Sequence, residues 1–98
     1  MAKPVYVLFM ARFKEAWYQL SNEEQNSLFE KVNAARDQAG GKPVVVCDSA
    51  WSSEMWQAFG VEVYPDAEAL QKHSAMLTEL NWYRYVDSMI VLGTEIPA

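Results

Sequence analysis

The sequence has little of what several classes of functional protein require. Only eight Lys and Arg residues stand against 13 Asp and Glu residues, and the formal net charge is −5. A nucleic-acid partner is therefore not expected, because phosphate binding needs a concentrated basic surface. Cys47 is the only cysteine, which excludes an internal disulfide and a cysteine-based zinc site. A reducing cytoplasm is the expected location.

Long apolar runs and the common catalytic motifs are absent as well. The opening MAKPVYVLFMARF has an apolar run that is too short for a secretory signal with its cleavage site, and Arg12 interrupts it. No segment approaches the roughly 18 apolar residues of a membrane span. The chain has no Gly-rich phosphate loop, nucleophile elbow or His-rich metal spacing. Membrane insertion, hydrolysis and nucleotide-dependent chemistry are therefore not expected, and neither a metal nor a cofactor is predicted.

The residues that are present are those of a folded protein. Hydrophobic residues make up 51% of the 98 residues and aromatic residues 13%, a composition that a disordered chain does not reach. A chain of this length can bury one core and is too short for two. We therefore expect a single domain over residues 1–98.

The predicted elements follow the order strand, helix, strand, strand, helix, strand. Ser21 and Glu24 have the spacing of a capping box at the start of the first helix, and Gly40-Gly41 ends it. Asp66 is expected to cap the second helix. The predicted strands cover residues 4–12, 42–51, 56–65 and 83–93. This order predicts an α+β fold of the ferredoxin-like βαββαβ type, with both helices on one face of a four-stranded antiparallel sheet.

The other face of this sheet is predicted to be apolar. Both alternating sets of side chains in residues 4–12 are largely apolar, and in the last strand Met89 and Val91 lie opposite Ile90 and Leu92. A sheet with one face in water alternates apolar and polar residues, and these strands do not. We therefore expect a homodimer in which two such faces meet and form a barrel that can hold a small molecule.

Three segments, together with the strand order, resemble the dimeric α/β-barrel superfamily over nearly the whole chain: AWYQL, FGVEVYPDAEALQKH and NWYRYV. The likeness is greatest to small, largely uncharacterised bacterial members. The resemblance implies the dimeric barrel. The superfamily includes cofactor-free monooxygenases of polyketide quinones, haem-degrading monooxygenases, muconolactone isomerases and stress-response barrels. The haem-degrading members have a tryptophan and a helical histidine, as this chain has, but this chain lacks their asparagine in the first strand, so no haem is expected.

His73 is the only histidine and lies in the apolar stripe of the second helix. Leu70, Leu77 and Leu80 continue this stripe at helical spacing, so the imidazole is predicted to face the protein. One interpretation is a buried imidazole that bonds to a backbone carbonyl, or a partly exposed residue at the border of the stripe. The other, which the resemblance suggests, is a general base or a haem ligand in a pocket between helix and sheet.

Glu62 is the second candidate catalytic residue. The alternation of AFGVEVY places it opposite Val61 and Val63, and we expect it on the face that the barrel buries. A carboxyl group there would have a raised pKa and could accept a proton. The alternative is an ion pair with Arg12 or Arg84, or a position near the barrel rim in water.

The abundant aromatic side chains are candidates for the wall of an apolar pocket that binds a flat ligand. Their alternative role is packing in the core and the dimer interface. The predicted ligand-binding residues are Tyr6, Tyr64, Trp17, Trp56, Trp82 and Tyr85.

Two functions from different classes fit these features. The first is binding of a small apolar or aromatic molecule without catalysis. The second is a cofactor-independent monooxygenase or isomerase of an aromatic or quinol-type substrate, in which His73 or Glu62 removes a proton and Tyr6 or Tyr64 orients the substrate oxygen. A purely structural dimer, with a barrel packed solid, is the third. A pocket lined by His73 or Glu62 beside a tyrosine hydroxyl would favour the second.

Overall fold

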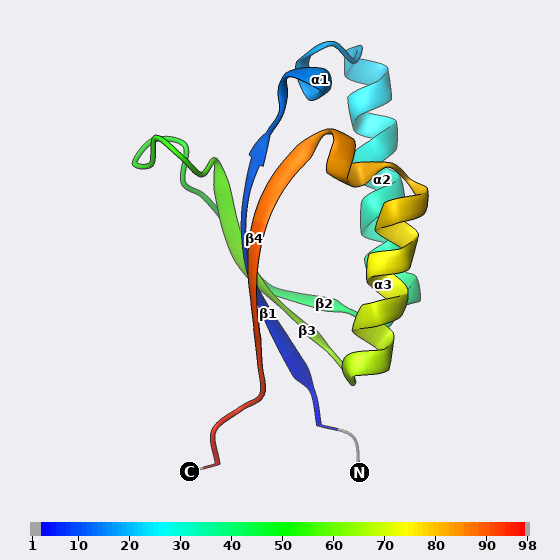
Figure 1. Cartoon of the computed structure of the whole chain (residues 1–98), viewed down its shortest axis with the longest axis vertical. Helices are drawn as coiled ribbons and strands as arrows, with labels where there is room; N and C mark the ends of the chain where they lie inside the picture. The colour runs from blue at the N-terminus through cyan, green and yellow to red at the C-terminus, as the bar shows by residue number, and fades with distance from the viewer. Residues whose placement is uncertain (1–2, 98) are drawn as a thin grey trace.

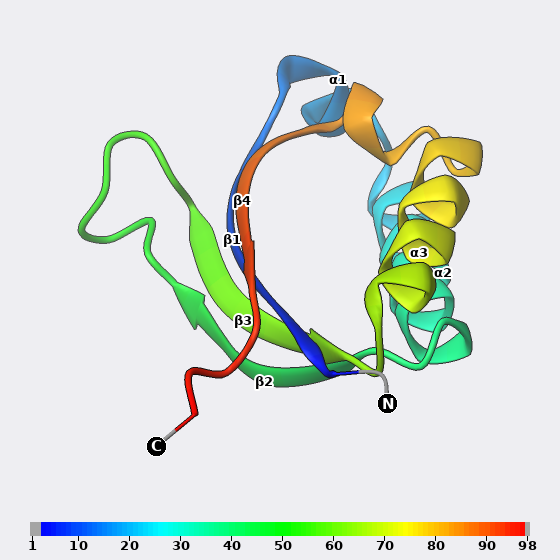
Figure 2. The same cartoon turned by 60° about the horizontal axis from the view of Figure 1, so that its bottom comes forward.

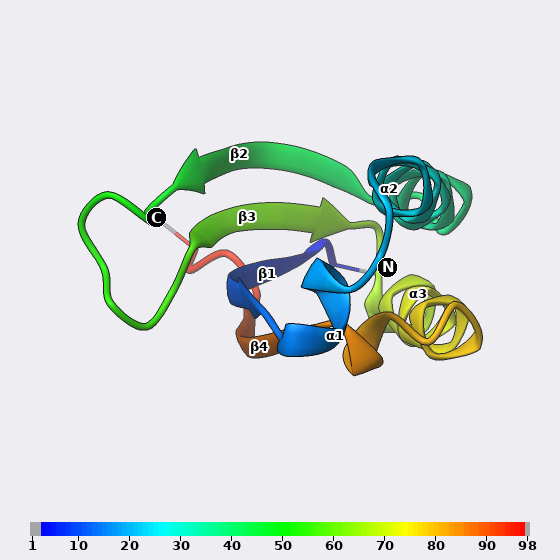
Figure 3. The ribbon, with the colours of Figure 1, turned by 90° about the horizontal axis from the view of Figure 1, so that it is seen from above.

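The computed structural model describes residues 3–97 and has the predicted order of strands and helices (Figure 1). The elements are β1 (Val5–Phe13), α1 (Glu15–Tyr18), α2 (Asn22–Gln38), β2 (Lys42–Asp48), β3 (Ala58–Tyr64), α3 (Ala67–Glu79), the 3₁₀ turn η1 (Trp82–Arg84) and β4 (Val86–Gly93). The four strands pair antiparallel in the order β2-β3-β1-β4, and α2 and α3 lie side by side on one side of the sheet (Figure 3). The predicted ferredoxin-like α+β fold is confirmed.

Both predicted helix caps are present. Ser21 Oγ accepts a hydrogen bond from the Glu24 amide at 3.1 Å, and Glu24 Oε1 accepts one from the Ser21 amide at 3.0 Å. The hydrogen bond from the Ser21 amide, and next the Ser21 side chain, lower the pKa of Glu24, because they favour its charged form. Asp66 Oδ1 accepts from the Ala69 amide at 2.7 Å at the start of α3. No helix within residues 3–97 has the length and apolar character that a membrane crossing requires.

The last predicted strand begins later than expected. Residues 82–84 form the turn η1, and β4 starts only at Val86. The reason lies at Asn81, whose φ of 56° ends α3 in the left-handed region that asparagine tolerates. The Arg84 and Tyr85 amides then donate to the Asn81 and Trp82 carbonyls, so this stretch has helical rather than sheet hydrogen bonds.

The connection from β2 to β3 is longer than predicted. Residues 49–57 form a loop that protrudes from the sheet on the side away from the helices (Figure 2). Local hydrogen bonds hold it, because Asp48 Oδ1 accepts from the Ala50 amide at 2.9 Å and Ser49 Oγ donates to the Trp56 carbonyl at 2.8 Å. Asp and Ser side chains at such positions favour turns over continued strands.

The core lies between the sheet and the two long helices. Val7, Ala39 and Tyr64 form its buried cluster, with Ala69 and Leu70 packed against them. The Tyr64 ring is only 1% exposed and lies directly against Gly41, where an added Cβ would overlap the ring. The backbone at the end of α2 thus makes room for Tyr64, which reaches toward α3.

The face of the sheet opposite the helices is apolar, as predicted. The strand register places ten apolar side chains on this open face: Tyr6, Leu8, Met10, Val45, Cys47, Phe59, Val61, Val63, Met89 and Val91. Leu8, on the central strand β1, is 41% exposed, and Val91 on the edge strand β4 is 56% exposed. No segment within residues 3–97 covers these two side chains.

Candidate functional site

A pocket of about 440 Å³ lies between the sheet and the helices α2 and α3. The sheet supplies Val7, Phe9 and Ile90 to its wall, and the helices supply Val32 and Leu77. Figure 2 shows that the sheet is curved, with its concave side toward α2 and α3. The volume falls within the range of about 300–1,000 Å³ that is typical of small-molecule sites. The monomer therefore has a largely apolar pocket of its own.

Aromatic rings form one end of the pocket. Phe13, Phe29 and Trp82 line it, and Trp17 packs behind them with only 5% of its surface exposed. Phe13 stacks on Trp17 with ring centroids 4.4 Å apart, and the Trp17 ring meets Phe29 edge to face at 5.0 Å. Such a cluster makes a rigid wall, because each ring is held by at least two others.

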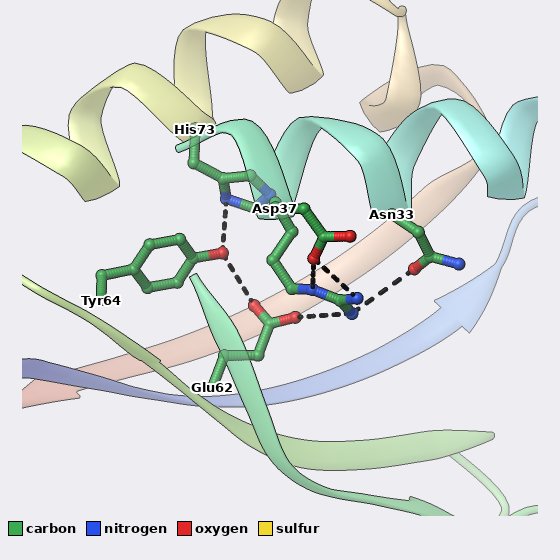
Figure 4. A network of polar contacts seen from close by, with 6 residues as sticks. Asn33, Asp37, Glu62, Tyr64 and His73 are labelled. Atoms are coloured by element: carbon green, nitrogen blue, oxygen red, sulfur yellow. Dashed lines mark hydrogen bonds and ion pairs between the residues drawn. The ribbon is translucent and has the colours of Figure 1, made fainter. Parts of the chain in front are cut away.

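A chain of polar groups forms another part of the wall. His73 lines the pocket from α3, is 8% exposed, and has its Nδ1 atom 3.0 Å from the Tyr64 hydroxyl (Figure 4). The same hydroxyl donates to Glu62 Oε1 at 3.1 Å. His73 therefore bonds to a tyrosine hydroxyl, not to the backbone carbonyl of the first interpretation.

Arg36 extends this chain from α2. Its Nη1 atom lies 4.0 Å from Glu62 Oε2, and the guanidinium also donates to Asp37 Oδ1 at 3.2 and 3.3 Å (Figure 4). Asn33 Oδ1 accepts from Nη1 at 3.5 Å. Asp37 and Asn33 thus hold the Arg36 cation beside Glu62. Of the two carboxylate oxygens of Glu62, Oε1 faces the Tyr64 hydroxyl and Oε2 faces the Arg36 cation.

Glu62 does not lie where the sequence analysis placed it. The predicted alternation is correct, since Val61 and Val63 share the open face and Glu62 points the other way. The helices, however, cover the Glu62 side of the sheet, so this residue lines the pocket of the monomer and not the open face. Its cationic neighbour is Arg36 rather than Arg12 or Arg84.

The burial of these groups changes their acidity. Burial raises the pKa of Glu62, while the Tyr64 hydrogen bond and Arg36 act in the opposite direction. Burial, and next the Glu62 charge, raise the pKa of Tyr64, which therefore stays protonated. Burial lowers the pKa of His73, and the Arg36 cation lowers it further. The imidazole is thus neutral near neutral pH and can accept a proton.

The other predicted ligand-binding residues are scattered. Trp82 lines the pocket and Tyr64 reaches it only through its bond to His73. Tyr6 lies on the open face, and the Trp56 ring lies 5.7 Å from the Arg12 guanidinium. Tyr85 lines a separate, shallower hollow beside α2. A direct ligand contact of Tyr6, Trp56, Tyr85 or the buried Trp17 stays a prediction.

Sequence reasoning missed Arg36, Phe13 and Ser74, which all contribute to the pocket wall. A signal for Arg36 was present, because it follows Phe29 by seven residues and Val32 by four, the spacing of one helix face. Within residues 3–97, no three His, Cys, Asp or Glu side chains converge in a way that could hold a metal ion.

Comparison with known proteins adds information on the fold. No family model and no curated protein matches the chain. A protein of unknown function from Rhodopseudomonas palustris has a TM-score of 0.72 and 17% identity, and the match covers 100% of this chain and 86% of that one. A hypothetical protein of Arabidopsis thaliana has a TM-score of 0.62 and 13% identity, with 98% and 91% covered.

An enzyme shares the fold as well. SnoaB, a cofactor-independent oxygenase from Streptomyces nogalater, has a TM-score of 0.51 and 17% identity, and the match covers 99% of this chain and 97% of SnoaB. The likeness shows the fold. At such identities, one fold supports several unrelated chemistries, so the site has to be judged from its own residues.

Proposed function

We propose that this protein binds a small apolar or aromatic molecule in the pocket between the sheet and the helices. The observation that carries this proposal is the pocket of about 440 Å³, which has aromatic rings at one end and a few polar groups, His73 among them, in an otherwise apolar wall. A largely apolar lining gives affinity, and a small number of fixed polar groups orients the ligand. A purely structural role would not require such a space.

The test is to fill the pocket. Ser88 lies on the helix-facing side of β4 and lines the pocket, so Ser88→Phe would occupy the space of a ligand. Binding of flat probes, 1-naphthol and naphthalene-1,4-diol, is measured by calorimetry on the whole chain. We expect Ser88→Phe to weaken binding about tenfold or more, a loss near 1.4 kcal/mol.

Gln71→Phe is the matched control, because Gln71 is exposed on α3 and does not line the pocket. It should leave the affinity within about twofold of the wild type. Equal affinity of the wild type and Ser88→Phe would place any bound probe elsewhere. Failure of every flat aromatic probe to bind would favour the purely structural dimer.

A second candidate is a cofactor-independent monooxygenase or isomerase of an aromatic or quinol-type substrate. The neutral imidazole of His73 in the pocket wall favours it, since both reactions begin with removal of a proton from the substrate. SnoaB, with the same fold, is a cofactor-independent oxygenase. In this function His73 is the base, and Glu62 acts through Tyr64 because both of its oxygens are already engaged.

Turnover of a panel of quinols tests this second function. His73→Ala should lower the rate at least about a hundredfold, the usual contribution of a general base. Lys72→Ala, a change of the neighbouring exposed residue on α3, is the control and should keep the rate. Unchanged turnover in His73→Ala would remove it as the base, and no turnover by the wild type would leave binding alone.

We further propose that the chain is a homodimer of the dimeric α/β-barrel superfamily, paired through the open face. The ten apolar side chains of this face support the proposal, because at about 25 cal/mol per Å² their burial would release many kcal/mol before the costs of association. A closed two-fold pair is the commonest way to bury such a surface. The partner subunit would then pack against the open face of the sheet, and the ligand would bind on the opposite face.

A further inference from the structure

The Tyr64 hydroxyl is shared between two groups that both could take its proton. Its oxygen lies 3.1 Å from Glu62 Oε1 and 3.0 Å from His73 Nδ1. A phenol has one proton to donate and can also accept. Both hydrogen bonds therefore form only if one of the two neighbours supplies a second proton.

The neighbours of Glu62 decide which arrangement holds. Burial raises the pKa of Glu62, whereas the Tyr64 hydrogen bond and Arg36, whose Nη1 atom is 4.0 Å from Glu62 Oε2, favour the ionised carboxylate, which can only accept hydrogen bonds. Tyr64 then donates to Glu62, and the second proton has to come from His73 Nδ1. In the alternative tautomer, the proton is on Nε2 and the unprotonated Nδ1 faces the Tyr64 oxygen. The only proton of that hydroxyl is already donated to Glu62, so no hydrogen bond would join Tyr64 and His73.

The other ring nitrogen is open. His73 Nε2 makes no hydrogen bond to any residue from 3 to 97, and none of the side-chain N or O atoms there is both buried and unpartnered. Nε2 therefore keeps exposed surface. Since His73 lines the pocket and its Nδ1 atom is engaged by Tyr64, Nε2 is the ring nitrogen left available to a ligand.

We propose that Glu62 is a positioning residue that acts through Tyr64 to hold His73 in the Nδ1–H tautomer, so that the lone pair of Nε2 is presented to the pocket. A ligand group that meets His73 is then a hydrogen-bond donor, and a proton that leaves the ligand goes to Nε2. This inference deepens the proposed function and rests on it for the ligand, while the tautomer itself is a property of the free protein.

The tautomer can be observed directly because the chain has a single histidine. Long-range ¹H–¹⁵N spectra of the labelled whole chain distinguish a protonated, pyrrole-like ring nitrogen from an unprotonated, pyridine-like one. At a pH well above 6.5, where the imidazole is neutral, we expect a pyrrole-like Nδ1 and a pyridine-like Nε2 in the wild type. A pyrrole-like Nε2 in the wild type overturns the proposal.

Glu62→Gln tests the role of the carboxylate. Arg36 attracts the amide oxygen of the new side chain, so its NH₂ group faces Tyr64 and donates to it. Tyr64 then donates to His73 Nδ1, and the two ¹⁵N shifts should exchange their character. Glu68→Gln, at an exposed position on α3, is the matched control and should keep the wild-type pattern.

Tyr64→Phe removes only the hydroxyl and keeps the test decisive if Glu62→Gln does not fold. We expect it to abolish the Nδ1–H preference and to give the Nε2–H form, which imidazole side chains favour in water. A folded Glu62→Gln or Tyr64→Phe protein with the wild-type pattern overturns the proposal. These spectra are recorded without ligand, so a failure of the 1-naphthol binding experiment leaves their result intact, and the reverse also holds.

Discussion

At the scale of single residues, the site depends on how burial and charge act on His73. Its Nδ1 atom is engaged by Tyr64, and the Arg36 cation opposes a second positive charge nearby. A neutral imidazole in an apolar wall costs little to bury, whereas the charged form would lose its hydration. The residue is therefore held ready to accept a proton rather than to give one.

This burial makes stability depend on pH. The pKa of His73 is lowered in the folded protein from its ordinary value of 6.5, so the unfolded chain binds a proton first as the pH falls. The free energy of unfolding should decrease as the pH falls below 6.5, by at most about 1.4 kcal/mol per pH unit, until the folded imidazole is also protonated. Urea unfolding across this range measures the slope. Glu62, whose pKa is raised, contributes with the opposite sign above 4.5.

His73→Gln should flatten the dependence just below pH 6.5, because glutamine does not titrate. Lys72→Gln, at the adjacent exposed position, should keep the wild-type slope. An identical slope in wild type and His73→Gln would mean that the folded imidazole titrates as in the unfolded chain, and that burial and Arg36 do not lower its pKa.

Two tryptophans form a matched pair for a test of the aromatic end. Trp17 is 5% exposed and contacts three rings, whereas Trp51 is 84% exposed in the loop after β2. We expect Trp17→Ala to cost about 3–5 kcal/mol of unfolding free energy. Trp51→Ala should cost no more than about 0.5 kcal/mol. Comparable losses of unfolding free energy in the two variants, measured by chemical denaturation, would contradict the placement of Trp17 in the core.

At the scale of elements, the helix caps fix where α2 and α3 begin and therefore which side chains face the sheet. In the capping box of α2, Ser21 and Glu24 satisfy each other's amides. Ser21→Ala should lower the unfolding free energy by about 1 kcal/mol. Ser27→Ala, at an exposed position inside the same helix, should be neutral or slightly stabilising, since alanine favours helix. Equal effects of the two changes in thermal unfolding would refute the cap's contribution.

The elements could be predicted because their signals are local. The start of each long helix is marked within one turn by its capping residues, Ser21 and Glu24 for α2 and Asp66 for α3. The alternation around Glu62 gives its orientation relative to Val61 and Val63. Alternation does not say which side of a sheet the helices cover when both sides are apolar. That choice is tertiary, and it is the reason why Glu62 was assigned to the wrong face.

The polar chain of the site was predictable only in part, for the same reason. His73 and Glu62 were singled out by residue type, but they belong to different elements and meet only through Tyr64. Arg36 joins them across the space between α2 and β3, a contact that no sequence spacing encodes. The helical spacing from Phe29 and Val32 indicates that Arg36 lies on the inner face of α2, but it does not indicate that Glu62 is its partner.

At the scale of the whole molecule, one curved sheet serves two purposes. Its inner face forms the pocket with the helices, and its open face remains apolar and exposed. Figure 3 shows that α2 and α3 lie on one side of the sheet. Stable interfaces bury about 1,200–2,000 Å² in total, and a continuous four-stranded face can supply a surface of that order from its two copies. The dimer proposal follows from this face and does not depend on the pocket.

Leu8→Lys tests the dimer at its centre. Leu8 lies on the open face of the central strand β1, next to Val61 and Val91. A charge placed between two apolar sheets is costly to bury, so sedimentation equilibrium should show a dimer for the wild type and a monomer for the variant. Gln71→Lys on the exposed side of α3 should remain a dimer. A monomeric wild type at micromolar concentration would end the dimer proposal.

The most direct test of the central claim is an NMR titration of the whole chain with 1-naphthol, followed at side chains on both faces of the sheet. Binding in the pocket predicts that the His73 ring and the Leu77 and Ile90 methyl groups, which line the pocket, change their chemical shifts as the probe is added. The Val61 and Val91 methyl groups, on the open face, should change little. Shifts confined to Val61 and Val91, with His73 unaffected, would contradict it.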